Sequence, residues 1–216
     1  QAFAKHLSEA GITVDGEPSR AAASGGAREL ASVSSAPLSD ILALSLKTSD
    51  NTMTEVEGRL VAVHAKQSAD FAGASKAVIA QLGKDGFDTS GLTLLDASGL
   101  AKGNKVPARL LAQILAKAAG GEGGSAGRTL IADLPVAALD GTLTNRLHDT
   151  TAAGTVRAKT GSLERTSSLA GVVTTADGRL LAFSMLANDF PANGGGAAAA
   201  VIDSHFVAPL ASCGCS

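Results

Sequence analysis

The sequence predicts an α/β fold in which a helical subdomain precedes an antiparallel sheet of three strands and a C-terminal helix. Two features of the chain support this prediction. Apolar residues recur at helical spacing in several segments between residues 37 and 115, whereas residues 155–188 form three strand-like segments. Asp177-Gly178, between the second and third of these segments, is a hairpin signal.

The composition supports a packed core and argues against several classes of function. Of the 216 residues, 45% are hydrophobic and 18% charged, and the net charge is −2 without a long basic run. Binding to nucleic acid or to an anionic membrane is therefore not indicated. Aromatic residues make up 3%, with no Trp or Tyr, so rings that stack on bases or sugars are scarce. No stretch has the roughly 18 apolar, uncharged residues of a membrane span.

Residues 1–36 are predicted to hold the end of a helix, a short strand, and a loop rich in Gly, Ser and Ala with one helical turn. The helix end is predicted at residues 1–10, before Gly11, and the short strand at Ile12 and Val14. The loop covers residues 15–36, with the helical turn around Arg28–Ala31. The first residue is Gln rather than Met, so we expect a chain that has been processed or cut.

Four helices are predicted next, followed by a flexible glycine-rich loop. The helices span residues 37–47, 52–66, 69–82 and a segment that opens at Pro107, and the loop is Gly120–Gly127. Residues 128–150 are expected to mix helical turns with loop. The strands are predicted at Thr155–Leu163, Ser167–Thr175 and Arg179–Asn188, and a final helix at Ala197–Leu210 would cover one face of the sheet.

The two cysteines, Cys213 and Cys215, stand in a C-G-C run at the end of the chain. Neighbours this close rarely have good geometry for a disulfide with each other. Two interpretations stay open: free thiols on a frayed tail, or pairing with cysteines in another segment, which would fit an oxidising compartment.

Two tripeptides carry the candidate chemistry. Ser49-Asp50-Asn51 lies at a predicted helix junction, and Lys159-Thr160-Gly161 lies in a predicted strand. Taken alone, the first could simply cap the next helix, and Lys159 could be a solvated strand lysine. Together, in this order and context, they match two of the three elements S-x-x-K, S-D-N and K-T-G of serine acyl-transferases that recognise penicillin.

The chemistry of acyl transfer explains these residue types. Attack by a serine on an amide needs a base, an acid for the leaving amine and a stabilised oxyanion. Ser49, placed between two lysines, can relay a proton, and Asn51 can hydrogen-bond the substrate backbone and one lysine. Lys159 supplies positive charge near a substrate carboxylate and keeps a neighbouring lysine neutral by repulsion.

The strand that carries Lys159 also offers groups for binding a peptide. Lys159 and Gly161 fall on one face, and glycine there leaves room for a substrate to lie against the strand edge and pair with its backbone. Thr160 and Ser162 offer hydroxyls to the terminal carboxylate of the substrate. The N–H of Ser162 is a candidate oxyanion donor.

With these motifs the chain resembles the low-molecular-mass class C penicillin-binding proteins, the D-alanyl-D-alanine carboxypeptidase/endopeptidases. The D-G-T-L segment is particularly characteristic of this class. The resemblance spans Leu46–Asp189 and rests on Leu46–Asn51, Asp96–Leu100, Leu134–Val136, Asp140–Leu143 with Arg146, Val156–Leu163, Leu169–Gly171 and Leu181–Ser184. The family usually has D-G-S-G-L-S where this chain has Ala97 and Ala101, and K-T-G-T where it has Ser162, which keeps a hydroxyl.

The resemblance implies a penicillin-binding/β-lactamase-like transpeptidase fold and a serine D-alanyl-D-alanine carboxypeptidase that works through an acyl-enzyme and is inhibited by β-lactams. Additional endopeptidase activity stays open. The implied catalytic residues are Ser49, Asn51 and Lys159, and the implied substrate-binding residues are Thr160, Gly161 and Ser162.

No serine in the sequence stands three residues before a lysine, so the resemblance places the nucleophilic serine and its lysine upstream, on another segment. Residues 1–36 then become the tail of an inserted domain and a linker. Residues 37–212 become the C-terminal part of the catalytic domain, and residues 213–216 a tail.

The expected partners are a peptidoglycan stem peptide ending in D-Ala-D-Ala, β-lactam antibiotics and the N-terminal segment of the same protein, but no nucleic acid. No metal or organic cofactor is expected, because the four histidines are scattered and two cysteines alone do not make a metal site. The expected location is outside the cytoplasmic membrane, after secretion. Two alternatives stay open: a β-lactamase, and a non-catalytic protein that binds cell-wall peptides.

Overall fold

The computed structural model describes residues 2–17, 19–22 and 24–214. The chain divides into two compact units, Gln1–Ser35 and Ala36–Ser216. Within the described ranges, no helix combines the length and the apolar character that crossing a membrane requires.

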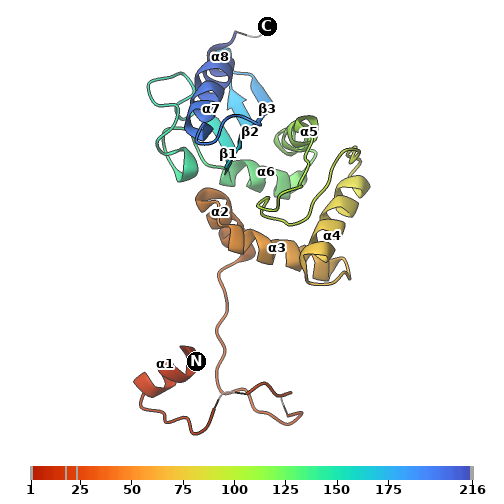
Figure 1. The fold of residues 1–216 in the computed structure, drawn as a ribbon, viewed down its shortest axis with the longest axis vertical. Coiled ribbons are helices and arrows are strands. Elements are labelled where there is room, and N and C mark those ends of the chain that lie inside the picture. The colour runs from red at the N-terminus through yellow and green to blue at the C-terminus, as the bar shows by residue number, and fades with distance from the viewer. Residues whose placement is uncertain (1, 18, 23, 215–216) are drawn as a thin grey trace. The chain divides into compact units, whose positions relative to one another are not determined.

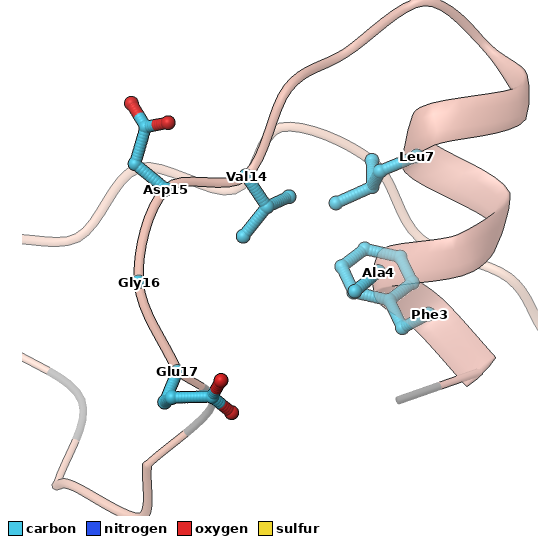
Figure 2. Close-up of a pocket in the computed structure, with 7 residues that line it drawn as sticks. All are labelled: Phe3, Ala4, Leu7, Val14, Asp15, Gly16 and Glu17. Carbon is cyan, nitrogen blue, oxygen red and sulfur yellow. The ribbon is translucent and has the colours of Figure 1, made fainter.

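The first unit contains one helix, α1 (Ala2–Glu9), which confirms the helix predicted before Gly11. Ile12 and Val14 do not form the predicted strand, and Arg28–Ala31 do not form the predicted turn of helix. Figure 2 shows Val14 facing Leu7 and Phe3 of α1 around a hollow of about 280 Å³. Val14 therefore faces the preceding helix across this hollow, and no neighbouring strand within the described part of this unit is available for pairing.

The second unit begins with three helices, α2 (Leu38–Thr48), α3 (Asn51–His64) and α4 (Phe71–Lys84). The predicted helices therefore exist, with α4 displaced by two residues. Small residues bring α3 and α4 together: a Cβ atom added to Gly58 would lie 3.4 Å from Ala74 and 2.6 Å from Ala97. This part of the chain is the predicted helical subdomain.

The prediction of a flexible loop at Gly120–Gly127 is wrong for its second half. Helix α5 (Ala108–Ala119) is followed closely by α6 (Gly124–Asp133), which packs against it. Gly127 is buried, and a Cβ atom there would lie 2.9 Å from the Cα of Ala118. These glycines therefore allow two helices to approach closely rather than making the chain mobile.

An antiparallel sheet of three strands, in the order β1-β2-β3, forms the centre of this unit. Its strands are β1 (Val156–Leu163), β2 (Thr166–Thr174) and β3 (Leu180–Asn188), within a few residues of the predicted bounds. Helices cover both faces of the sheet (Figure 1): α7 and α8 lie over one face, and α5 packs against β2 and β3. The α/β class and the three-stranded sheet are confirmed.

The hydrophobic core lies between the sheet and the C-terminal helices. Val156, Leu169 and Val173 from the strands are fully buried beside Ile202 and Val207 from the helices. Phe183 and Phe206 meet edge to face, with ring centroids 6.1 Å apart. The opposite face of β1 carries Lys159, so the core holds the strand from one side while the lysine projects on the other.

The predicted C-terminal helix is a succession of α7 (Gly195–Ile202), a five-residue π-helical turn at Asp203–Val207 and α8 (Ala208–Ser212). Pro209 near the start of α8 lacks the N–H that a regular α-helical turn would use, which accounts for a wider turn here. Arg146 pairs with both carboxylate oxygens of Asp203 in this turn.

The interpretation of free thiols at the end of the chain is wrong for Cys213. This residue follows α8 and takes part in a disulfide bond. Cys215 lies outside the described residues.

Candidate active site

Ser49 lies at the junction between α2 and α3. Its backbone is left-handed, with φ 55° and ψ 46°, and its N–H donates to the carbonyl of Ser45. The next residue, Asp50, caps α3 by accepting a hydrogen bond of 2.9 Å from the N–H of Met53. The tripeptide does therefore cap the next helix, but the cap is the side chain of Asp50. The Ser49 hydroxyl takes no part in it and can make other contacts.

Lys159 projects from β1 and meets Ser49 across the fold. Its Nζ donates to the Ser49 Oγ at 2.6 Å and to the carbonyl oxygen of Thr160 at 2.9 Å. These two side chains come from positions 110 apart in the chain. Burial of the lysine lowers its pKa below the ordinary value of 10.5, because the charged form loses solvation. The predicted proximity of the two motifs is confirmed.

Thr160 and Gly161 are both fixed by neighbours that the sequence did not reveal. The hydroxyl of Thr160 donates to that of Thr142 at 2.9 Å. A Cβ atom on Gly161 would lie 2.3 Å from the Oγ of Ser168 on β2. A side chain at position 161 would therefore displace the Ser168 hydroxyl, which lies over the glycine.

The backbone of Ser162 points toward the edge of the sheet that β2 does not occupy. Backbone N–H groups alternate in direction along a strand, so those of Ala158 and Ser162 point the same way. The N–H of Ala158 donates to the carbonyl of Pro135, on the side away from β2. The N–H of Ser162 is thus directed outward at an exposed residue, where an added peptide strand could reach it.

Asn51 is the first residue of α3, and its side chain is exposed. It is not drawn into the contact between Ser49 and Lys159: no hydrogen bond of its side chain to another described residue is formed. Its predicted role toward a substrate stays a prediction.

Sequence reasoning did not assign a role to Lys47 or Asp140, which the structure joins in an ion pair two residues before Ser49 in α2. The Nζ of Lys47 lies 2.7 Å from Oδ2 and 2.9 Å from Oδ1 of Asp140. Asp140 opens the D-G-T-L segment and Lys47 lies two residues before Ser49, so their opposite charges were the available signal. Only the fold shows that they meet.

The two hollows described in the molecule lie elsewhere. One belongs to the first unit, and the other, of about 310 Å³, is lined by Ala116, Ala119, Gly120, Leu180 and Ala182 beside α5 and β3. Within the described residues, no group of three His, Cys, Asp or Glu side chains is arranged to hold a metal ion.

A family model described as D-Ala-D-Ala carboxypeptidase 3 (S13) matches residues 1–206. The chain belongs to this family. Among curated relatives, the carboxypeptidase DacB of Mycolicibacterium smegmatis is 43% identical over 194 residues, which are 88% of this chain and 41% of that protein. The D-alanyl-D-alanine carboxypeptidase of Actinomadura sp. is 35% identical over 86% of this chain and 35% of its own length.

Solved structures of other proteins share the fold. Penicillin binding protein 4 (dacB) from Haemophilus influenzae, in a complex with a β-lactam, matches with a TM-score of 0.77 and 32% identity over 86% of this chain and 43% of that chain. A β-lactamase from Chitinophaga pinensis matches with a TM-score of 0.53 and 22% identity, covering 70% of this chain and 56% of that one, a likeness of fold alone. The predicted penicillin-binding/β-lactamase-like fold is confirmed. This S13 chain spans about two fifths of the curated relatives that it matches.

Proposed function

We propose that this chain is part of a serine D-alanyl-D-alanine carboxypeptidase that acts on peptidoglycan stem peptides through an acyl-enzyme. The observation that carries the proposal is the 2.6 Å contact between the Lys159 Nζ and the Ser49 Oγ, which unites the S-D-N and K-T-G motifs. Membership of the S13 family supports the reaction class. The β-lactam complex of the Haemophilus influenzae relative supports inhibition by this class of antibiotic.

The attacking serine and its lysine would come from a segment outside these 216 residues, since no serine here stands three residues before a lysine. That serine adds to the carbonyl of the terminal D-Ala–D-Ala bond, the C–N bond breaks, and D-Ala leaves as the amine. Water then hydrolyses the ester, which regenerates the serine and releases the shortened peptide.

Ser49 would deliver a proton to the leaving amine. Its Oγ accepts a hydrogen bond from Lys159, so its own proton is directed to another acceptor. A lysine of the missing segment, acting as base toward the nucleophile, would return a proton to Ser49. This relay needs the serine hydroxyl to stay in place, and Lys159 holds it.

Lys159 would also stabilise the bound substrate. An ammonium group has three N–H donors, and Ser49 and Thr160 use two of them. The third can reach the terminal carboxylate of a peptide that lies along β1. The outward N–H of Ser162 would then face the oxyanion of the tetrahedral intermediate.

The substrate lies outside the cytoplasmic membrane, so we propose an extracytoplasmic, secreted protein. The other partners that we propose are β-lactams and the N-terminal segment of the same protein.

The test is to treat the full-length protein with a fluorescent penicillin and to measure D-Ala release from a peptide ending in D-Ala-D-Ala. We expect a stable covalent label and release of one D-Ala per peptide. Rapid loss of the label as hydrolysed antibiotic would favour a β-lactamase instead. Neither label nor release from a correctly folded protein would favour a non-catalytic peptide binder.

A further inference from the structure

The end of α2 and the strand β1 are joined at a second place besides the contact of Ser49 with Lys159. Lys47, in the last turn of α2, directs all its donors into the segment 134–140. Its Nζ donates to the Leu134 carbonyl at 2.8 Å and to the two carboxylate oxygens of Asp140 at 2.9 and 2.7 Å. The ammonium group therefore has a full set of acceptors.

Asp140 is in turn fixed to the backbone that runs beside β1. Its Oδ1 accepts the N–H of Val136 at 2.7 Å. Val136 forms an isolated antiparallel bridge with Arg157 of β1, and the N–H of Ala137 donates to the carbonyl of Val156. A rigid path thus leads from Lys47 through Asp140 to the strand that carries Lys159.

The two connections have the same spacing on both elements. Lys47 precedes Ser49 by two residues, and Arg157 precedes Lys159 by two residues. Helix α2 and strand β1 are therefore connected twice, once through Lys47, Asp140 and Val136 and once through Ser49 and Lys159. Together with the two chain segments between them, these connections close a ring. A ring of this kind fixes the distance between α2 and β1 more firmly than either contact alone.

The segment also fits tightly against α2. Gly141 has φ +57°, and a Cβ atom there would lie 2.7 Å from the backbone oxygen of Lys47. The next residue, Thr142, accepts the hydrogen bond from Thr160 on β1. The D-G-T-L segment therefore touches both elements that carry the proposed catalytic residues.

The charges of the ring are complementary at neutral pH. Burial acts to raise the pKa of Asp140, but hydrogen bonds from Lys47 and Val136 and the positive charges of Lys47 and Arg157 outweigh it and lower the pKa below 3.8. Asp140 is thus ionised at neutral pH.

We infer that Lys47 and Asp140 are positioning residues that hold the hydroxyl of Ser49 at its working distance from the ammonium of Lys159. This inference rests on the proposed function for its kinetic consequences. The positioning itself does not depend on the proposed function, because all the contacts of the ring lie within this chain. Neither residue needs to touch the substrate.

The experiment compares Lys47→Met, Asp140→Asn and the double variant in the full-length protein. We expect each single variant to slow acylation by penicillin about 100-fold, as a catalytic group displaced by roughly 1 Å does. The loss should appear in kcat for D-Ala release rather than in KM. The double variant should be no slower than the worse single one, because both changes break one unit. Lys47→Arg should keep more of the rate than Lys47→Met.

Arg146→Met is the matched control, because it breaks an ion pair that is even less exposed, between Arg146 and Asp203, and leaves the Lys47–Asp140 pair in place. It should lower the Tm while acylation of the folded protein continues at the wild-type rate. Wild-type acylation by folded Lys47→Met would overturn the inference. An equal loss in Arg146→Met would also overturn it, since the effect would then be one of general stability.

Crystal structures separate this inference from the proposed function. If the wild-type protein neither binds penicillin covalently nor releases D-Ala, the proposed function fails, and the distance from Ser49 Oγ to Lys159 Nζ decides the inference. We expect the 2.6 Å contact in the wild type and its loss in Lys47→Met. An unchanged contact in that variant would refute the positioning role.

Discussion

The ammonium group of Lys159 donates to the hydroxyl of Ser49 over 2.6 Å, and burial keeps the pKa of this lysine below 10.5. A helix end and a sheet strand thus share one hydrogen bond in a place of reduced solvation. Charge in such a place acts more strongly on a substrate than charge on the surface does. The predictions below concern this contact and the residues that surround it.

Replacing Lys159 by Ala should slow the acylation of the full-length protein by penicillin about 100- to 1000-fold, the usual loss when one preorganised donor is removed. The cause is the loss of positive charge near the carboxylate and of the donor that orients Ser49. The rate of covalent labelling measures the effect. Lys102→Ala is the control, because that side chain is 96% exposed and makes only a 4.0 Å pair with Glu164. Labelling of Lys159→Ala at the control's rate would refute the role.

Acylation should decline with rising pH at a point below pH 10.5, because the lowered pKa lets Lys159 lose its proton there. In Lys159→Arg this alkaline decline should move to higher pH, since a guanidinium keeps its charge. The pH profile of the acylation rate checks both statements. If the acylation rate of Lys159→Arg declines at the same alkaline pH as that of the wild type, another group causes the decline.

Stability should respond to the same titration in the opposite sense. The unfolded chain holds the Lys159 proton up to about 10.5, while the folded chain releases it at lower pH. Between these two values the unfolded state binds more protons, so the free energy of unfolding should rise with pH. Denaturation of wild type and Lys159→Met across this range isolates the contribution, which should be missing from the variant.

Thr142→Val should lower the free energy of unfolding by about 1 kcal/mol, because the Thr160 hydroxyl loses its half-buried acceptor. Thr144→Val is a suitable control, since its hydroxyl is exposed and donates only to the nearby carbonyl of Gly141. Denaturant titrations of the two variants should therefore differ. Equal values would mean that the contact between the two threonines contributes nothing to stability.

Gly141→Ala should destabilise the protein more than Gly178→Ala, although both glycines have positive φ. The shared backbone penalty is about 1–2 kcal/mol. At Gly178 the new methyl group meets open space, whereas at Gly141 it would lie 2.7 Å from the backbone oxygen of Lys47. Thermal unfolding gives the comparison. A Tm for Gly141→Ala equal to that of Gly178→Ala would show that the segment can move away from α2 without cost.

The helices could be predicted from apolar spacing, but the face that they bury could not. Val56, Leu60 and Val63 recur at helical intervals in α3, yet they are 50%, 51% and 58% exposed. The buried residues of this helix are Gly58 and Ala62, where α4 and the residues around Ala97 approach closely. Hydropathy ranks small residues as weak core formers, so a close contact of this kind leaves little trace in the pattern.

The sequence allowed us to predict only those residues of the candidate site that belong to the two tripeptide motifs. Ser49 and Lys159 were paired because two tripeptides occur in a known order, and Thr160 and Gly161 came with them. Thr142 belongs to the D-G-T-L segment, but nothing in that segment indicates its contact with Thr160. Ser168 carries no local signal, because a hydroxyl that lies against a strand looks like any other in the sequence. Lys47 and Asp140 are 93 positions apart, and only the folded backbone shows that their charges meet.

The left-handed backbone at Ser49 limits which amino acids evolution can place there. Threonine offers the same oxygen, but its branched β-carbon clashes with a backbone at φ 55°. Asparagine and glycine tolerate the turn but carry no hydroxyl. The exchange of serine for threonine is conservative at most positions. At position 49 it should not be tolerated, because the protein needs both the left-handed backbone and the hydroxyl proton there. Among related proteins, nucleotide changes in this codon should therefore be synonymous.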